Sequence, residues 1–195
     1  MAEAFFQATA WTMDTPKPYG AFHLVLTVLG VSLSIFLARK FSFPERKAGP
    51  DTILFLCGLF LGLTELYKQG FIYYIENGRT YDWWYFPFQL CSVPMYLGLF
   101  IPMVPARIRN VFYLFIQDFG LLGGIMALAE PSGLMHPYWT MTVHGFLWHF
   151  NLIFMGLICA FYNLKTETPK SYLHTIPLFL FCTAIATAVN VLSHP

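Results

Sequence analysis

The hydrophobic pattern divides the chain into six long apolar stretches separated by short polar or charged connections. Each stretch is close to the length of about 20 residues that a helix needs to cross the hydrocarbon core of a bilayer. We therefore predict an all-α, polytopic membrane protein with six transmembrane helices in one bundle, forming a single domain over residues 1–195. The predicted helices cover residues 21–38, 52–67, 86–104, 110–129, 139–162 and 172–192.

Composition supports the membrane class and excludes one kind of partner. Hydrophobic residues make up 57% of the chain and charged residues 11%, whereas a soluble domain has roughly 25% charged residues. The formal net charge is only +1, and a nucleic-acid partner would require a clustered basic face. We expect a multi-pass membrane protein with membrane lipids as partners and no nucleic-acid partner.

The basic residues predict the orientation of the bundle. With six helices, both termini lie on one side of the membrane. Most basic residues fall in connections on the opposite side: Arg39, Lys40, Arg46, Lys47, Arg107, Arg109, Lys165 and Lys170. Because basic loops are usually cytoplasmic, we predict that both termini face outward.

Polar residues inside the apolar stretches gather toward the outer ends of the predicted helices. A polar side chain in hydrocarbon costs free energy unless it finds a partner, so such residues suggest a site. We infer a polar cavity that opens toward the outer leaflet, with Asp118 and His149 near its floor. Its other candidate residues are His23, Glu65, Gln89, Cys91, His144 and Asn190.

Cysteine and histidine together suggest nucleophilic chemistry in this cavity. A cysteine attacks as its thiolate, a histidine acts as the base, and a carboxylate or amide orients the histidine. Cys91 and His144 each lie roughly 7 to 8 Å below the start of their predicted helices, whereas His149 lies roughly 15 Å down. Depth thus favours His144 as the base. Five residues of helix also rotate a side chain by about 140°, so we expect the two histidines to point in different directions.

Proline, glycine and cysteine positions predict a helix bend, a close helix contact and free thiols. Pro94 should bend the third helix beside Cys91, because it cannot donate a hydrogen bond to the carbonyl of Leu90. Gly58 and Gly62 stand in the GxxxG spacing that favours close helix packing. All four cysteines lie in apolar runs and form no CxxC pair, and the histidines form no HxxxH pair. We predict no disulfide framework, no metal site and no cofactor.

Three motifs carry a resemblance to a known family. They are FPFQLC at 86–91, GLLGGIMALAEP at 120–131 and HPYWTMTVHGFLWHF at 136–150, followed by Asn190. Together they resemble the YwaF-type family of bacterial integral membrane proteins, which is similar to the transmembrane protein 164 acyltransferase family. Gln89 and Asp118 depart from the pattern, in which histidine and an apolar residue are expected, and the family is expected to continue in an Asn- and Tyr-rich segment after Asn190.

The resemblance implies a location and a reaction. It implies a bacterial plasma membrane and an intramembrane Cys–His pair that acts on acyl lipids, with Cys91 as nucleophile and His149 as base, ahead of His144. Our first hypothesis is a lipid acyltransferase or acyl hydrolase; His23, Glu65, Gln89, Asp118 and Asn190 would then bind the acyl-lipid substrate. The alternative is a non-enzymatic lipid-binding or small-solute transport protein, and a third interpretation is a structural subunit.

Overall fold

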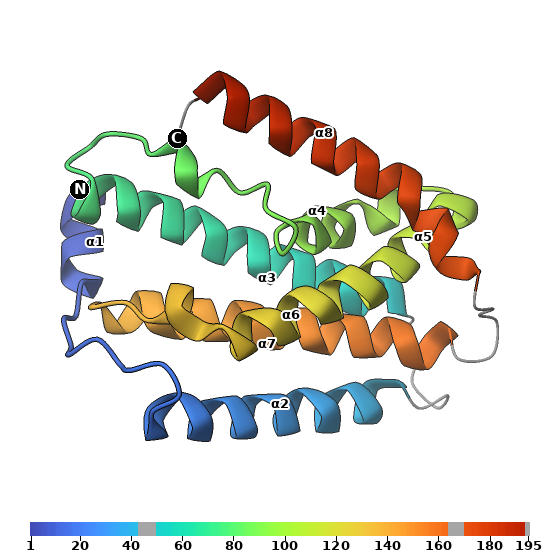
Figure 1. Cartoon of the computed structure of the whole chain (residues 1–195), viewed down its shortest axis with the longest axis horizontal. Helices are drawn as coiled ribbons and strands as arrows, with labels where there is room; N and C mark the ends of the chain where they lie inside the picture. Colours follow the sequence, from blue (N-terminus) through green and yellow to red (C-terminus); the bar gives the residue numbers. More distant parts are fainter. Residues whose placement is uncertain (43–49, 164–169, 194–195) are drawn as a thin grey trace.

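The computed structural model describes residues 1–42, 50–163 and 170–193, and these residues are helical with no strand. A single bridge joins Thr12 to Tyr138. The first helix, residues 2–9, and the last described residues before 194 lie toward the same end of the bundle (Figure 1). The all-α prediction is confirmed. Arg46, Lys47 and Lys165, which form part of the orientation argument, lie outside the described residues.

Eight α-helices and six shorter helical turns follow one another in the described residues. The N-terminal part consists of α1 (Ala2–Thr9), α2 (Ala21–Ser42), α3 (Pro50–Phe71) and its π-helical extension η1 (Ile72–Glu76). The middle part consists of η2 (Trp83–Tyr85), α4 (Val93–Phe100), η3 (Ile101–Met103), α5 (Ala106–Phe115), η4 (Ile116–Gly120) and α6 (Leu121–Ala129). The last part consists of η5 (Pro131–Leu134), α7 (Trp139–Asn163), η6 (Ser171–Thr175) and α8 (Ile176–Ser193).

Five of these helical segments are long and apolar enough to cross a membrane: Ala21–Ser42, Pro50–Glu76, Ala106–Ala129, Trp139–Tyr162 and Ser171–Ser193. The third predicted helix, 86–104, differs from the structure. Helical geometry there runs only over Val93–Met103, about 16 Å at 1.5 Å per residue, against a hydrocarbon core of roughly 30 Å. Between α3 and α5 the chain runs back along the bundle, first without regular structure and then as α4 (Figure 1).

Proline explains where α4 begins. Pro94 lies in its first turn, where a missing N–H leaves no intrahelical hydrogen bond unmade. The prediction that Pro94 bends a continuous helix beside Cys91 is therefore wrong, because residues 86–92 precede the helix. The backbone of Ser92 donates to the carbonyl of Gln89 at 2.8 Å in a turn at this point. Gln89 and Cys91 consequently lie in an irregular segment rather than in helical turns.

The second predicted helix is longer than expected. It was predicted to end at Tyr67, whereas α3 and η1 continue to Glu76. Lys68 therefore belongs to a long apolar helix and not to a connecting loop. This change places a cation inside the bundle.

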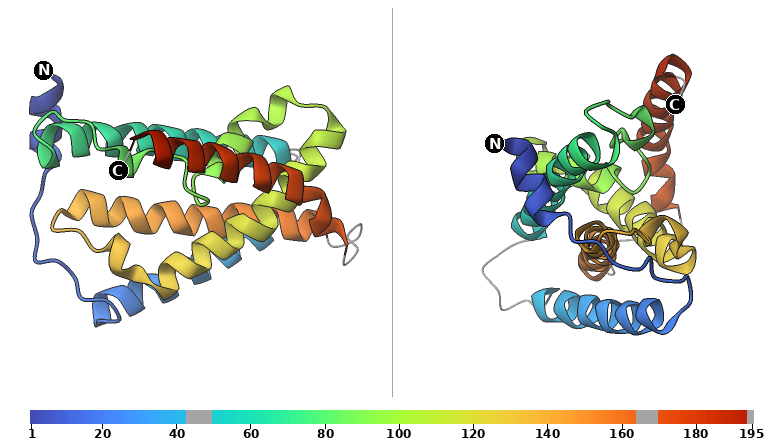
Figure 2. Two further views of the ribbon diagram at one scale, coloured as in Figure 1. Left: turned by 45° about the horizontal axis from the view of Figure 1, so that its top comes forward. Right: turned by 90° about the vertical axis from the view of Figure 1, so that its left-hand side faces the viewer.

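Helix α7 lies at the centre of the bundle, with half of its apolar window buried, compared with 11% for α8. Figure 2 shows α8 standing away from the other helices at the edge of the molecule. Glycines allow the closest contact in the core, between α3 and α4. A Cβ added to Gly58 would lie 2.7 Å from the backbone nitrogen of Leu99, and one added to Gly98 would lie 2.7 Å from the carbonyl oxygen of Leu54.

Candidate functional site

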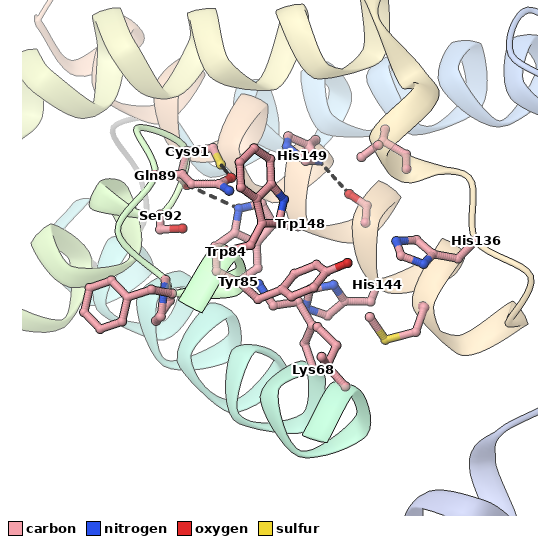
Figure 3. A pocket seen from close by; sticks show the side chains of 17 residues that line it. Lys68, Trp84, Tyr85, Gln89, Cys91, Ser92, His136, His144, Trp148 and His149 are labelled. Carbon is pink, nitrogen blue, oxygen red and sulfur yellow. Dashed lines mark hydrogen bonds between the residues drawn. The ribbon is translucent and has the colours of Figure 1, made fainter. Parts of the chain in front are cut away.

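A polar cavity of about 240 Å³ lies between α3, α7, the segment before α4 and the loop that contains η5. Cys91, Gln89, His144 and His149, all candidates from the sequence, lie on its wall. Figure 3 shows these side chains converging from different elements of the chain. Other polar or aromatic residues in the lining are Lys68, Trp84, Tyr85, Ser92, His136 and Trp148.

Helix α7 supplies one wall through a single broad face. Met141, His144, Gly145, Trp148 and His149 all line the cavity, and their i, i+3, i+4, i+7, i+8 spacing corresponds to one face of a helix. The two histidines occupy opposite edges of this face, with Trp148 near its middle. The two histidines do lie on different edges of the helix, as expected. Both nevertheless line the same cavity, because the cavity extends across the whole face.

Cys91 is held at the cavity wall by backbone and side-chain contacts. Its carbonyl accepts a hydrogen bond from the indole Nε1 of Trp148 at 3.2 Å. Its thiol donates to Oε1 of Gln89 at 3.8 Å. Among the hydrogen bonds of the described residues, none joins the sulfur to His144 or His149. The resting position of the thiol is thus beside an amide in the same cavity as the histidines.

The electrostatic surroundings of Cys91 favour its neutral form. The Cys91 side chain is partly buried in the cavity wall, where the neutral thiol is favoured over the charged thiolate. Removing a charge from water disfavours ionisation. Any reaction through this sulfur therefore needs a base that removes its proton.

His149 has a defined tautomer. Its Nδ1 lies 2.7 Å from the carbonyl oxygen of Gly145, and a carbonyl can only accept a hydrogen bond. The proton must therefore reside on Nδ1, which leaves Nε2 with its lone pair in the neutral ring. A backbone carbonyl thus orients this histidine, and no carboxylate is required.

His144 has a different environment. Its Nε2 is buried and has no hydrogen-bond partner among the described residues. Its ring lies against Trp148, with ring centroids 5.6 Å apart. A buried polar atom without a partner is costly, so Nε2 of His144 is ready to accept or donate a hydrogen bond to a ligand in the cavity.

An ion pair lies at the third part of the wall: Lys68 lines the cavity, whereas its partner Glu65 is not part of the lining. Glu65 is 4% exposed, and its Oε1 accepts from Nζ of Lys68 at 2.8 Å and from Nε2 of Gln69 at 2.7 Å. Gln69 also donates to the backbone carbonyl of Tyr85 at 2.6 Å, which ties the irregular segment to α3. The ammonium of Lys68 lies 6.0 Å from the centroid of the Trp148 ring, a cation–π distance.

Four predicted residues lie away from the cavity lining: Glu65, which reaches it only through its ion pair with Lys68, and His23, Asp118 and Asn190. His23 is buried and fully occupied: its Nδ1 accepts from the backbone N–H of Tyr19 at 3.3 Å, and its Nε2 lies 3.0 Å from the carbonyl of Leu128. Asp118 lies in the π-helical turn η4, where its Oδ1 accepts from Gln117 at 3.5 Å. Asn190 borders a smaller neighbouring cavity. His23 therefore joins α2 to the end of α6 as a structural contact.

Lys68 and Trp148 are the main residues that sequence reasoning did not assign to the site. The signal for Lys68 was its spacing of three residues from Glu65, which permits an ion pair on one face of a helix.

Among the described residues, no group of three or more histidine, cysteine or acidic side chains could hold a metal ion. The four cysteines are free thiols.

Five helices that are long and apolar enough to cross a membrane define the class of the protein: a multi-pass, all-helical membrane protein. Comparison with known families identifies it further. The sequence model of the TMEM164 family matches residues 18–194, nearly the whole chain, and the chain belongs to this family. The resemblance to the transmembrane protein 164 family is thereby confirmed. Searches of curated proteins and of solved structures each found no match.

Proposed function

We propose that the protein is a membrane-embedded lipid acyltransferase or acyl hydrolase, with Cys91 as nucleophile and His149 as base. The observation that carries the proposal is the hydrogen bond from Nδ1 of His149 to Gly145, since it leaves the Nε2 lone pair free on a residue that lines the same cavity as Cys91. A nucleophile and an oriented base at one cavity are the requirements of covalent acyl transfer. The family membership supports a membrane protein and is compatible with this chemistry.

The reaction has two steps. In the first, Nε2 of His149 takes the thiol proton as the sulfur attacks the acyl carbonyl of a lipid ester; a C–S bond forms, the ester C–O bond breaks, and the leaving alcohol takes the proton from the imidazolium. In the second, a lipid hydroxyl or water attacks the thioester and gives a proton to His149. The C–S bond breaks, and the thiolate recovers that proton.

One rearrangement must precede the first step. The Cys91 sulfur rests beside Gln89, and a rotation about χ1 to another staggered position would redirect it. An entering acyl group would displace the thiol from the Gln89 amide. Gln89 would then offer its own N–H to the carbonyl oxygen, while His144 and Lys68 contact the polar part of the lipid.

The irregular segment supports a location within the membrane. We propose that residues 77–103 form a third crossing of six, in which backbone without regular structure precedes the short helix α4. Such backbone is tolerated at membrane depth where it is buried in protein or lines a cavity, and Gln89, Cys91 and Ser92 line one. Six crossings place both termini on the same side, which the positive-inside rule assigns to the exterior of a bacterial plasma membrane.

A non-enzymatic role in binding lipids or transporting a small solute is the second candidate. The specific observation in its favour is that the Cys91 thiol bonds to an amide in a partly buried wall, where the neutral thiol is favoured over the thiolate. In this case the cavity would hold a ligand, and His144 would bind it through Nε2. Replacing Cys91 with alanine would then leave ligand affinity unchanged.

Intact mass spectrometry distinguishes the two candidates. The purified protein is incubated with dioleoyl phosphatidylcholine, and wild type is compared with Cys91→Ala, His149→Ala, His144→Ala and the control Cys182→Ala, which alters a cysteine outside the cavity. We expect an oleoyl adduct that hydroxylamine removes, that Cys91→Ala and His149→Ala abolish, and that Cys182→Ala retains. Loss with His144→Ala alone would make His144 the base, and no adduct on folded wild type would refute acyl transfer from this donor class.

A further inference from the structure

A second cavity lies directly beside the one that contains Cys91. Its volume is about 180 Å³. Aromatic side chains of the irregular segment form one wall, and the last turns of α8 form the other: Trp83, Trp84, Phe86 and Phe88 face Ala186 and Val189. Asn190 is exposed at its rim. Apart from its two amides, the lining is apolar or aromatic, as expected for a site that holds hydrocarbon.

The two cavities share a wall. Trp84, Phe86 and Gln89 line both of them. Gln89 is also the residue that accepts the hydrogen bond of the Cys91 thiol. A ligand that moved the Gln89 side chain would therefore join the cavities and release the thiol at the same time.

Helix α8 is held firmly only at its beginning. Leu178, Phe179 and Cys182 pack into the main core, and Phe179 stacks on Phe119 with centroids 5.1 Å apart. Among the described residues after Cys182, none belongs to a hydrophobic cluster of the bundle. Little apolar surface would have to separate for this half of α8 to move away from the aromatic segment.

We propose that this second cavity holds one hydrocarbon chain of a diacyl lipid, which enters sideways from the bilayer between α8 and residues 83–89. The polar headgroup lies in the larger cavity near Lys68, and the ester carbonyl lies at the shared wall, next to Cys91. The chain-binding site deepens the proposed function and rests on it for the placement of the ester. The proposed site for the chain itself rests on the aromatic and aliphatic side chains in its lining and on the wall that it shares with the larger cavity.

Photolabelling tests the chain-binding site without requiring catalysis. A phosphatidylcholine with a diazirine on its acyl chain is incorporated with the full-length protein into nanodiscs and irradiated, and labelled residues are located by peptide mass spectrometry. The variants are Ala186→Phe and Val189→Phe, which fill the cavity, and the matched control Ala188→Phe, whose position is exposed on the same helix. Each protein is also prepared with Cys91→Ala.

We expect labels within 83–88 and 186–190 in wild type and in Cys91→Ala. Ala186→Phe and Val189→Phe should each reduce them at least fivefold, and Ala188→Phe should keep them within twofold. Labels confined to the exposed outer face of α8, or an equal loss in all three variants of α8, would overturn the proposal. Thermal unfolding of each variant separates loss of the site from loss of the fold.

A second measurement separates this proposal from the acyl-transfer reaction. Acylation of Cys91 is compared for dioleoyl phosphatidylcholine and for p-nitrophenyl butyrate, whose short chain needs no groove. Ala186→Phe should slow acylation by the long-chain lipid at least tenfold and leave acylation by the ester within twofold. Equal slowing of both donors would contradict the chain site. Labelling without acylation by either donor would instead refute the acyl-transfer step and leave the chain site standing.

Discussion

Gly58 is the position where a single methyl group should most directly displace the segment that contains Cys91. Glycine at this point allows α3 to contact the backbone of α4. A Cβ on Gly58 would lie 2.7 to 2.9 Å from three backbone atoms of α4, whereas ordinary contact begins at 3.4 Å. Backbone atoms cannot avoid the methyl group by changing rotamer. In Gly58→Ala, α4 must therefore retreat from α3 by about 0.7 Å, the difference between these distances.

Gly62→Ala provides the matched control. It lies one turn further along the same helix, and its added Cβ would reach only Cδ1 of Leu99, at 3.7 Å. Both substitutions gain the helix propensity of alanine over glycine, about 1 kcal/mol. This gain cancels in the comparison, so the difference between the variants isolates the cost of overpacking, typically about 1–3 kcal/mol.

The assay is thermal unfolding of the two variants in the same detergent. At about 2–4 °C per kcal/mol for a chain of this size, we expect Gly58→Ala to unfold roughly 6 °C below Gly62→Ala. Iodoacetamide should also react with Cys91 at a changed rate only in Gly58→Ala, because α4 and the segment before it move together. Equal midpoints for the two variants would refute the close contact between α3 and α4.

The remaining predictions concern the cavity wall. The Cys91 thiol is partly buried, and burial disfavours the charged thiolate. Alkylation by iodoacetamide should therefore rise about tenfold per pH unit between pH 7 and 9, and a plateau below pH 8 would contradict this. Glu65→Gln leaves the Lys68 ammonium unpaired and should lower the free energy of unfolding by about 2–4 kcal/mol. Adding Lys68→Met should restore most of that loss, and a double variant no more stable than Glu65→Gln would argue against the pair. Trp148→Phe removes the hydrogen bond to the Cys91 carbonyl and should cost about 1–3 kcal/mol, measured by thermal unfolding; an unchanged midpoint would mean that another donor replaces the indole.

The sequence by itself determined the class of the fold. A run of about 20 apolar residues has few stable arrangements other than a membrane helix, because every backbone polar group must be satisfied within the segment. Length and hydropathy therefore located five of the six predicted helices to within a few residues at most ends. The prediction of the third helix, 86–104, was wrong at its start, because two prolines and a run of aromatic residues interrupt the helix without lowering the hydrophobicity of the segment.

The sequence also indicated which residue types could form a site. Cys91, Gln89, His144 and His149 were candidates because polar groups in apolar segments are costly, and the structure places all four at one cavity. His23 was a candidate for the same reason, yet it satisfies both ring nitrogens with backbone groups. Sequence patterns cannot distinguish these cases, because one of the two partners of His23, the Leu128 carbonyl, lies far away in the sequence on α6.

Tertiary structure alone decided how the site is arranged. The proximity of the polar cavity to α8 depends on the path of the irregular segment 77–92, which no periodicity encodes. The tautomer of His149, by contrast, is set within α7, by the carbonyl of Gly145 four residues earlier. Local pattern fixes which segments enter the membrane, whereas contacts between segments far apart in the sequence fix where Lys68, Cys91 and the histidines meet.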